Sequence, residues 1–210
     1  MRYQHEDDER AEERKARRPI SAPLPLCSSN RWWQFSQYLS GRGLDPDLAH
    51  DNFWYPSLCA GDDLPRIVIP ATNMTGHCYW QARAMVDTEK RYQSPPVPRG
   101  DSIIIVWPKY TATKMVVCEG PLDALAAAEC GCLGVSLMGN APNRGVLNHV
   151  VSICPSLPLL VVGDTDDLAA AAGIAVPLSM RRPTKFVMLN TRDGKDLAAL
   201  TFEQRKALVD

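Results

Sequence analysis

Hydrophobic positions along this chain follow two different patterns, and the change comes near residue 114. Before it, short apolar runs are separated by turn and proline residues. After it, apolar runs alternate with alanine-rich or amphipathic stretches of helical spacing. Alternating strands and helices predict right-handed crossovers and a buried parallel sheet. We therefore expect an α/β unit over residues 113–210, preceded by a smaller α+β unit over residues 30–112.

The smaller unit is expected to open with two helices. The stretch NRWWQFSQYLSGRG is amphipathic, with Asn30 as its expected cap and Gly41 at its end. The stretch DPDLAHDNFWY predicts a second, short helix, because Asp45 can cap it and Pro46 suits a first helical position. Two large aromatic side chains in the first helix, Trp32 and Trp33, are expected to pack in the core rather than on a nucleobase.

Strands are expected in the rest of this unit. Residues 66–86 predict two strands around a turn at 73–76, and residues 102–107 predict a third. Between them, residues 90–101 are expected to form a loop, because three prolines within four residues oppose both helix and sheet ladder.

The larger unit is expected to alternate strictly between strands and helices. One helix is expected to break near Pro177, and the chain is expected to end helically. The expected strands are residues 114–120, 132–137, 157–164 and 185–189, and the expected helices are residues 121–131, 141–155 and 166–182.

Composition narrows the class of protein. Residues 1–18 carry six acidic and six basic side chains and a proline-rich stretch follows, so residues 1–29 predict a disordered tail.

The net charge of −1 gives no global attraction to nucleic acid or lipid, so such contacts need local basic clusters. Seven cysteines without a C-x-x-C pair favour a reducing compartment. Without a signal peptide or an apolar membrane span, we expect a cytoplasmic protein with no membrane partner.

Acidic residues follow three of the expected strands. Glu119 comes after Met115 to Cys118, Asp164 and Asp166 come after Leu159 to Val162, and Asp196 lies shortly after Lys185 to Leu189. In an open parallel sheet, ligands bind at the carboxyl ends of the strands, so we expect these side chains to converge. Asp167 is more suited to capping the next helix.

Converging carboxylates raise one another's pKa unless a cation neutralises them. Oxygen ligands with no histidine or cysteine nearby suit Mg²⁺ or Mn²⁺ rather than zinc. The pattern therefore predicts a metal site for phosphoryl-transfer chemistry, with room for two ions. A lone D-x-D at a strand end is common. The sequence of Glu119-Gly120, Asp123, the D-x-D and then Gly194-Lys195-Asp196 is far more specific.

These motifs carry a resemblance to a known family. VVCEGPLDALAAAECG, then LLVVGDTDDLAAAA and DGKDL, are similar to the Toprim domain of bacterial-type primases, topoisomerases and some nucleases. In the first unit, YLSGRGLDPDLAHDNFWYP, RIVIPATNMTGHCYWQARAM and RYQSPPVPRGD resemble the start, strand pair and loop of the primase catalytic core. The resemblance implies a Rossmann-like Toprim sheet, flanked by helices, behind a small α+β subdomain, as in a phage- or mobile-element primase.

The resemblance also implies roles for individual residues. Glu119 would bind metal or manage protons, Asp164 and Asp166 would bind metal, and Asp123 and Asp196 would support them. Seven residues would guide the template or the nucleotide. They are Arg42, Arg83, Lys90, Arg91, Tyr92, Arg99 and Lys195. A basic patch with an aromatic ring also suits a single-stranded backbone on physical grounds.

The implied reaction is metal-dependent nucleotidyl transfer from ribonucleoside triphosphates, making short RNA primers on a single-stranded DNA template. A replicative helicase or another replication protein is a further expected partner, in a phage- or plasmid-encoded setting within a bacterial host. No counterpart of the family's zinc-binding module and no Walker motif is present. The chain also departs from the family pattern at Leu168-Ala169 and at Ala198, where another acid is usual.

Two alternatives stay open. A Toprim nuclease would use the same acids to activate water, although the primase-like first unit argues against it. A non-catalytic module would bind single-stranded DNA or a replication protein without synthesis, and the missing acid at Ala198 leaves that open. A topoisomerase would need a separate domain carrying a nucleophilic tyrosine, for which this chain is too short.

Overall fold

The computed structural model describes residues 22–58, 60, 62–74, 78–139, 141–164, 168–189 and 196–210. The helices are η1 (Ser29–Arg31), α2 (Trp32–Ser40), α3 (Pro46–Asp51), α4 (Pro121–Glu129), α5 (Arg144–Ser152), α6 (Leu168–Ser179), η2 (Leu197–Ala199) and α7 (Phe202–Val209). The strands are β1 (Tyr55–Ser57), β2 (Arg66–Thr72), β3 (Cys78–Ala84), β4 (Tyr92–Gln93), β5 (Ile104–Val106), β6 (Met115–Cys118), β7 (Leu133–Ser136), β8 (Leu159–Gly163) and β9 (Thr184–Met188).

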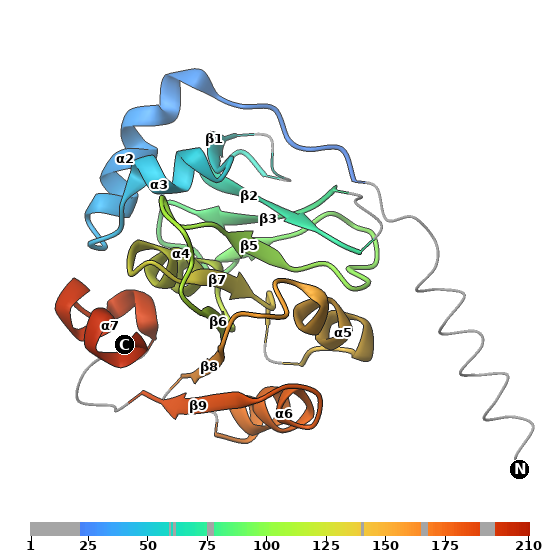
Figure 1. Ribbon diagram of the computed structural model, residues 1–210. Helices are drawn as coiled ribbons and strands as arrows, with labels where there is room; N and C mark the ends of the chain where they lie inside the picture. Colours follow the sequence, from blue (N-terminus) through green and yellow to red (C-terminus); the bar gives the residue numbers. More distant parts are fainter. Residues whose placement is uncertain are drawn as a thin grey trace, which may run out of the picture.

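The first sheet is an antiparallel meander in the order β1-β2-β3-β4, and α2 and α3 cover one of its faces (Figure 1). Alternate residues of β2 divide between two cores, as expected for a strand with side chains on both faces. Ile67 and Ile69 face the helices, where Phe35 packs against them. Val68 faces the other side.

The chain leading into the first helix also packs on this sheet. On the face opposite α2, Ala22 is buried in the cluster around Trp80. The indole Nε1 of Trp80 donates a hydrogen bond to the carbonyl of Pro23 at 3.0 Å. The Tyr55 hydroxyl donates to the carbonyl of Pro25 at 2.8 Å. Residues 22–28, which the sequence placed in a tail, are therefore held against the first sheet, whereas residues 1–21 lie outside the described part.

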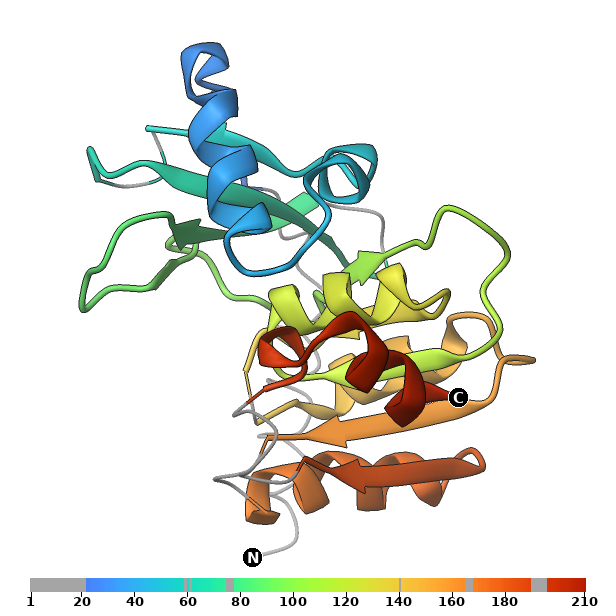
Figure 2. The same ribbon diagram turned by 90° about the vertical axis from the view of Figure 1, so that its left-hand side faces the viewer.

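The second sheet has the order β5-β7-β6-β8-β9. Strands β7, β6, β8 and β9 are mutually parallel, which confirms the predicted α/β fold. Strand β5 runs antiparallel to β7 at the edge, although it comes from the region before residue 113. Figure 2 shows the helices in layers on both sides of this sheet. Residues of β6 and β8 are buried throughout, as parallel strands covered on both faces require.

One apolar core joins the two sheets. It contains Phe35 and Trp54 from the first unit, Ile104 of β5, Leu125 of α4 and Val162 of β8. A second core fills the opposite face of the larger sheet under α5 and α6. The two units therefore share a buried interior.

Helix α4 lies unusually close to the larger sheet. A Cβ atom on Gly134 of β7 would stand 1.9 Å from the carbonyl oxygen of Ala124. No side chain fits in that space, so glycine lets the helix backbone rest directly on the strand. This contact sets the position of the first turn of α4, which carries Asp123.

Three local predictions were wrong. Helix α2 begins after a 3₁₀ turn and has Arg31, not Asn30, at its cap position, with no side-chain cap. Helix α6 continues through Pro177, because Leu178 beyond it is fully buried in the second core. Residues 92–93 form a short strand on β3 before the prolines begin. The Asp45 cap and the end of α2 at Gly41 are confirmed.

Some expectations fall outside the described residues. They concern the turn after residue 74, the acids Asp166 and Asp167, and Lys195. In the part of the chain that is described, no helix is long and apolar enough to span a bilayer.

Candidate active site

Two of the predicted acids leave the sheet side by side. Strands β6 and β8 are adjacent and parallel, with Val117 opposite Val161. Glu119 follows the end of β6 and Asp164 follows the end of β8. Both residues are partly exposed, and both lie at the carboxyl edge of the sheet. The predicted convergence of these two acids on one edge is therefore confirmed.

Asp123 approaches the same edge from the first turn of α4. Its carboxyl is buried, and Oδ1 accepts a hydrogen bond from the amide of Ala198 at 2.8 Å. That bond ties α4 to η2, where Asp196 caps the short helix by accepting from the amide of Ala199 at 2.8 Å. Ala198 thus contributes its backbone amide to the acidic edge.

The charges of these acids are coupled. Burial first, and then the carboxylates of Asp196 and Asp164, raise the pKa of Asp123 to about 8, although the hydrogen bond from the Ala198 amide lowers it. Burial also raises the pKa of the Cys118 thiol, with contributions from the carboxylates of Asp123, Asp164 and Glu119. Such mutual effects occur only between groups that lie near one another. These carboxyl groups therefore lie near one another at this edge, and Cys118 stays a protonated thiol.

The described residues alone do not complete a metal site. Among them, no three carboxylate, histidine or cysteine side chains are close enough to hold one ion together. Asp166, the predicted partner of Asp164, lies outside the described residues, as does Lys195. The ligand assignments for Glu119, Asp164, Asp166, Asp123 and Asp196 stay predictions.

A strained loop closes over Glu119. The Ser136 hydroxyl and the Gly139 amide both donate to the Glu119 carbonyl, at 2.9 and 3.3 Å. Between them, Met138 adopts a left-handed conformation with φ of 54°, which costs a non-glycine residue free energy. Arg99 fastens this loop, because its Nη1 donates to the carbonyls of Leu137 and Met138 at 2.7 and 3.0 Å. Arg99 therefore supports the site through the backbone.

Arginine–tyrosine stacks of the first unit lie near the acidic edge. The guanidinium of Arg83 lies 4.7 Å from the centre of the Tyr92 ring, and its Nε donates to the Tyr38 hydroxyl at 2.9 Å. The guanidinium of Arg42 lies 5.0 Å from the Tyr38 ring. The pKa of Tyr92 is raised to about 12, mainly by burial; Arg83 opposes this shift and the Asp123 carboxylate contributes to it. The stacks therefore lie within electrostatic range of the acidic edge.

The other predicted basic residues lie in the loop beyond β3. Lys90 and Arg91 are exposed, and both backbone carbonyls accept hydrogen bonds from the buried guanidinium of Arg66, at 3.0 and 3.4 Å. Arg66 is itself held by an ion pair with Asp62 at 2.7 Å. This pair keeps the pKa of the Asp62 carboxyl below its usual range. A buried arginine thus positions two exposed basic residues.

Sequence reasoning missed two of these positions. Tyr38 is in the last turns of α2 and Arg42 is in the turn directly after this helix, four residues further on, so a tyrosine at this spacing from a basic residue is a usable signal. Arg66 stood in a recognised stretch, but nothing in the sequence indicates that its side chain turns into the protein. Its partners lie up to 25 residues away in the chain.

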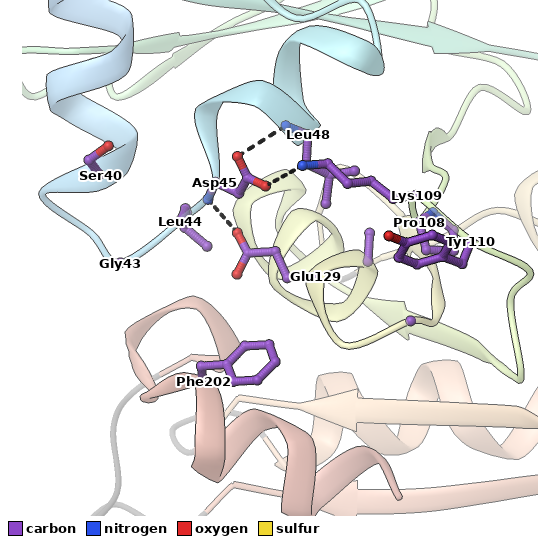
Figure 3. A pocket seen from close by; sticks show the side chains of 12 residues that line it. Ser40, Gly43, Leu44, Asp45, Leu48, Pro108, Lys109, Tyr110, Glu129 and Phe202 are labelled. Carbon is purple, nitrogen blue, oxygen red and sulfur yellow. Dashed lines mark hydrogen bonds and ion pairs between the residues drawn. The ribbon is translucent and has the colours of Figure 1, made fainter.

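A pocket of about 450 Å³ lies at the other end of α4, away from the acids (Figure 3). Leu44 and Leu48 form part of its wall, and Tyr110 and Phe202 stand at its rim. Its two carboxylates are already engaged. Asp45 pairs with Lys109 at 3.1 Å, and Glu129 accepts from the Asp45 amide at 2.6 Å.

Glu129 is also half of a buried ion pair. Nη1 of Arg205 lies 2.7 Å from Oε2 of Glu129 and 3.1 Å from the carbonyl of Gly43. Nη2 donates to the carbonyl of Ala198 at 2.8 Å. Arg205 is 1% exposed, so the pair joins α7, α4 and the first unit inside the protein.

Comparisons with known proteins identify the fold. No model of a known protein family matches this chain, and no curated protein sequence matches it either. Among solved structures, the DnaG primase catalytic domain bound to single-stranded DNA is similar at a TM-score of 0.60 with 17% identity, over 84% of this chain and 69% of that chain. The primase fragment of the bacteriophage T7 primase-helicase is similar at a TM-score of 0.60 with 16% identity, over 92% and 82%.

Proposed function

From the fold of a Toprim-type primase core, which this chain has, we propose that it is a nucleotidyltransferase of the primase type. It would join ribonucleoside triphosphates into short RNA primers on single-stranded DNA, in the replication of a phage or mobile element. One observation carries this proposal: Asp123, at the carboxyl edge of the second sheet, lies within electrostatic range of Tyr92, which belongs to the arginine–tyrosine stacks of the first unit. Acidic and basic groups this near one another suit a metal-bound triphosphate at the acids and a DNA backbone at the arginines.

Mg²⁺ or Mn²⁺ is the proposed cofactor, with Glu119, Asp164 and Asp166 as ligands and Asp123 and Asp196 in support. The residues present fit a hard cation. All five are carboxylates, the ligand type that hard cations prefer, and the pKa of Asp123 is raised by burial first and by the neighbouring carboxylates of Asp196 and Asp164 second. When bound, the metal would neutralise the triphosphate and align it for in-line displacement.

The protein residues have separate tasks in this proposal. The primer 3′-hydroxyl oxygen forms a bond to the α-phosphorus, the bond to the β-phosphate oxygen breaks, and pyrophosphate leaves. Glu119 accepts the hydroxyl proton. Arg42 and Arg83 hold template phosphates in register, because their guanidinium groups are already oriented by stacking on Tyr38 and Tyr92. Catalysis is then mostly positioning and electrostatic stabilisation.

A replicative helicase or another replication protein is the proposed macromolecular partner. The similar T7 fragment comes from a primase-helicase protein, which supports this part of the proposal. The similar DnaG domain was bound to single-stranded DNA, which supports the template.

The test is primer synthesis on single-stranded DNA with labelled ribonucleotides and Mg²⁺ or Mn²⁺. Wild type is compared with Asp164→Asn and with Asp51→Asn, an exposed acid at the end of α3, as matched control. We expect short RNA products that need the metal, survive Asp51→Asn and fall by at least a hundredfold with Asp164→Asn, roughly the loss expected when transition-state charge stabilisation is removed.

Other outcomes would overturn the proposal in different ways. Metal-dependent shortening of the DNA by wild type, lost in Asp164→Asn, would identify a nuclease. Binding of single-stranded DNA without either product, equal in all three proteins, would identify a non-catalytic module.

A further inference from the structure

Two neighbouring tryptophans of α2 have different surroundings. The Trp32 ring makes edge contacts with Phe35 and His50, at 5.1 and 5.0 Å between ring centres, and packs against the core. Trp33 is 58% exposed instead. The sequence-based expectation that both pack in the core therefore holds for Trp32 and is wrong for Trp33. A large exposed indole on an otherwise well-packed helix calls for an explanation, because aromatic rings are normally buried.

Trp33 borders a pocket of about 290 Å³ between α2 and the residues that precede β2 and follow β3. The walls are apolar, flat or amide-bearing, and none of them carries an acidic group. The lining residues are Trp33, Gln34, Gln37, Tyr38, Pro65, Met85 and Val86. An indole face, a thioether and nearby side-chain amides suit a flat, partly polar ring with hydrogen-bonding edges, and a nucleobase has that chemistry.

Tyr38 connects this pocket to the basic side of the site. Its ring lines the pocket, while its hydroxyl accepts from Arg83 and its ring stacks under Arg42. Arg83 in turn stacks on Tyr92, which lies within range of Asp123. A path of stacked rings and guanidinium groups thus runs from the acidic edge to Trp33. Figure 2 shows α2 lying across the first sheet, above the loop that follows β3.

The charge around this path suits a phosphate backbone. The stretch from residue 83 to residue 91 carries three basic residues, Arg83, Lys90 and Arg91, against two acidic ones, Asp87 and Glu89. Arg31, directly before α2, adds another basic side chain, and its Nη1 donates a hydrogen bond to the Gln34 side chain at 3.1 Å. A chain with a net charge of −1 thus places basic groups beside an exposed aromatic ring, and these are the two components of a single-strand binding surface.

We propose that this pocket binds a nucleobase of single-stranded DNA, with the Trp33 indole stacked on the base and the adjoining phosphates near Arg42 and Arg83. The inference rests on the proposed function only in that the DNA is the template strand. Trp33 is a binding residue at the far end of the template path and takes no part in the chemistry. Its contribution is therefore expected to depend on template length, because only a strand that extends past Arg42 and Arg83 would place a base in this pocket.

The test measures DNA affinity in the full chain carrying Asp164→Asn, so that no synthesis occurs. Trp33→Ala is compared with Trp33→Phe, which keeps a stacking ring, and with Trp107→Ala, which removes another tryptophan that is 52% exposed. Fluorescence anisotropy with labelled oligothymidines of about 4 and about 16 nucleotides covers the usual range of single-strand site sizes. Thermal unfolding midpoints verify that the three variants fold like the parent.

We expect Trp33→Ala to weaken binding of the longer strand by about 5- to 100-fold, the loss reported by alanine substitution at a stacked base. The shorter strand should lose less than twofold. Trp33→Phe should restore most of the affinity, and Trp107→Ala should change neither strand. A longer strand that lacks bases should bind the parent and Trp33→Ala equally.

Equal affinity of the parent and Trp33→Ala for the longer strand would overturn the inference. So would an equal loss on the strand that lacks bases, because that loss could not come from stacking, and so would failure of the parent to bind the longer strand. If the protein proved not to synthesise primers, the expected pattern of DNA affinities would still hold. Trp33-dependent binding without synthesis therefore separates the two proposals.

Discussion

The buried ion pair between Arg205 and Glu129 offers the sharpest test of how the two units are held together. Arg205→Met removes the guanidinium and keeps much of the volume. The change deprives the carbonyls of Gly43 and Ala198 of their donor and leaves Glu129, whose side chain is 9% exposed, without its cation. A single remaining partner, the amide of Asp45, cannot offset the burial of that charge.

The magnitude follows from this geometry. Breaking a buried ion pair by removing one partner typically costs about 3–5 kcal/mol, because the other charge is left buried. Nε of Arg205 has no hydrogen-bond partner among the described residues, so the wild-type arrangement is itself incomplete. We therefore expect a cost of about 3 kcal/mol, at the lower end of that range. Against a typical domain stability of about 5–15 kcal/mol, this is a large fraction.

Urea-induced unfolding, monitored by tryptophan fluorescence, measures this loss of stability. We expect the midpoint urea concentration to fall while the dependence of the unfolding free energy on urea concentration stays unchanged. The neighbouring Lys206→Met is the control. Lys206 is 50% exposed and pairs with Asp210 at 3.5 Å, a surface pair of the kind worth about 0.3–0.5 kcal/mol. Removing both buried charges, with Arg205→Met and Glu129→Leu together, should cost less than the sum of the single changes by about 0.5–3 kcal/mol.

A loss below about 1 kcal/mol for Arg205→Met would refute the reasoning, because it would mean that Glu129 finds water or another donor when the guanidinium is gone. Strict additivity in the double variant would refute it equally, since independent side chains do not share a desolvation penalty.

Two further predictions follow from the acidic edge and the contact beneath it. In metal-free buffer, the carboxyl of Asp123, with its pKa raised from 3.8 to about 8, makes the folded state lose stability as pH rises between those values. Asp123→Asn keeps an oxygen for the Ala198 amide but has no carboxyl to titrate. Its free energy of unfolding should therefore rise relative to that of wild type by up to about 1.4 kcal/mol per pH unit in that window. A stability difference that does not change with pH in urea titrations would contradict this. Gly134→Ala should lower the free energy of unfolding by about 1–3 kcal/mol, because the new methyl group forces α4 away from the sheet. Gly173 lies in open space on α6, so Gly173→Ala should instead stabilise the protein by roughly 0.5–1 kcal/mol in thermal unfolding. Equal effects of the two changes would show that the close approach to Ala124 is not what the glycine allows.

Local patterns predicted much of the fold because they report on short-range physics. Alternating apolar runs identified the strands and helices of the larger unit, and Asp45 before Pro46 identified a cap that the structure confirms. The failures were local signals overridden by packing. Pro177 did not end α6, because the buried Leu178 beyond it holds the helix against the sheet. Residues 92–93 formed a strand because β3 offered an edge to pair with.

The candidate site divides in the same way. The sequence alone determined that Glu119 and Asp164 would lie at one edge, because parallel strands joined by helices must end together. It could not determine that Asp123 would be buried among them, that Arg83 would lie between Tyr38 and Tyr92, or that Trp33 would face solvent while Trp32 packs inside. Those outcomes depend on which distant surfaces meet when two sheets share a core, and contacts across such separations leave no periodic trace in the chain.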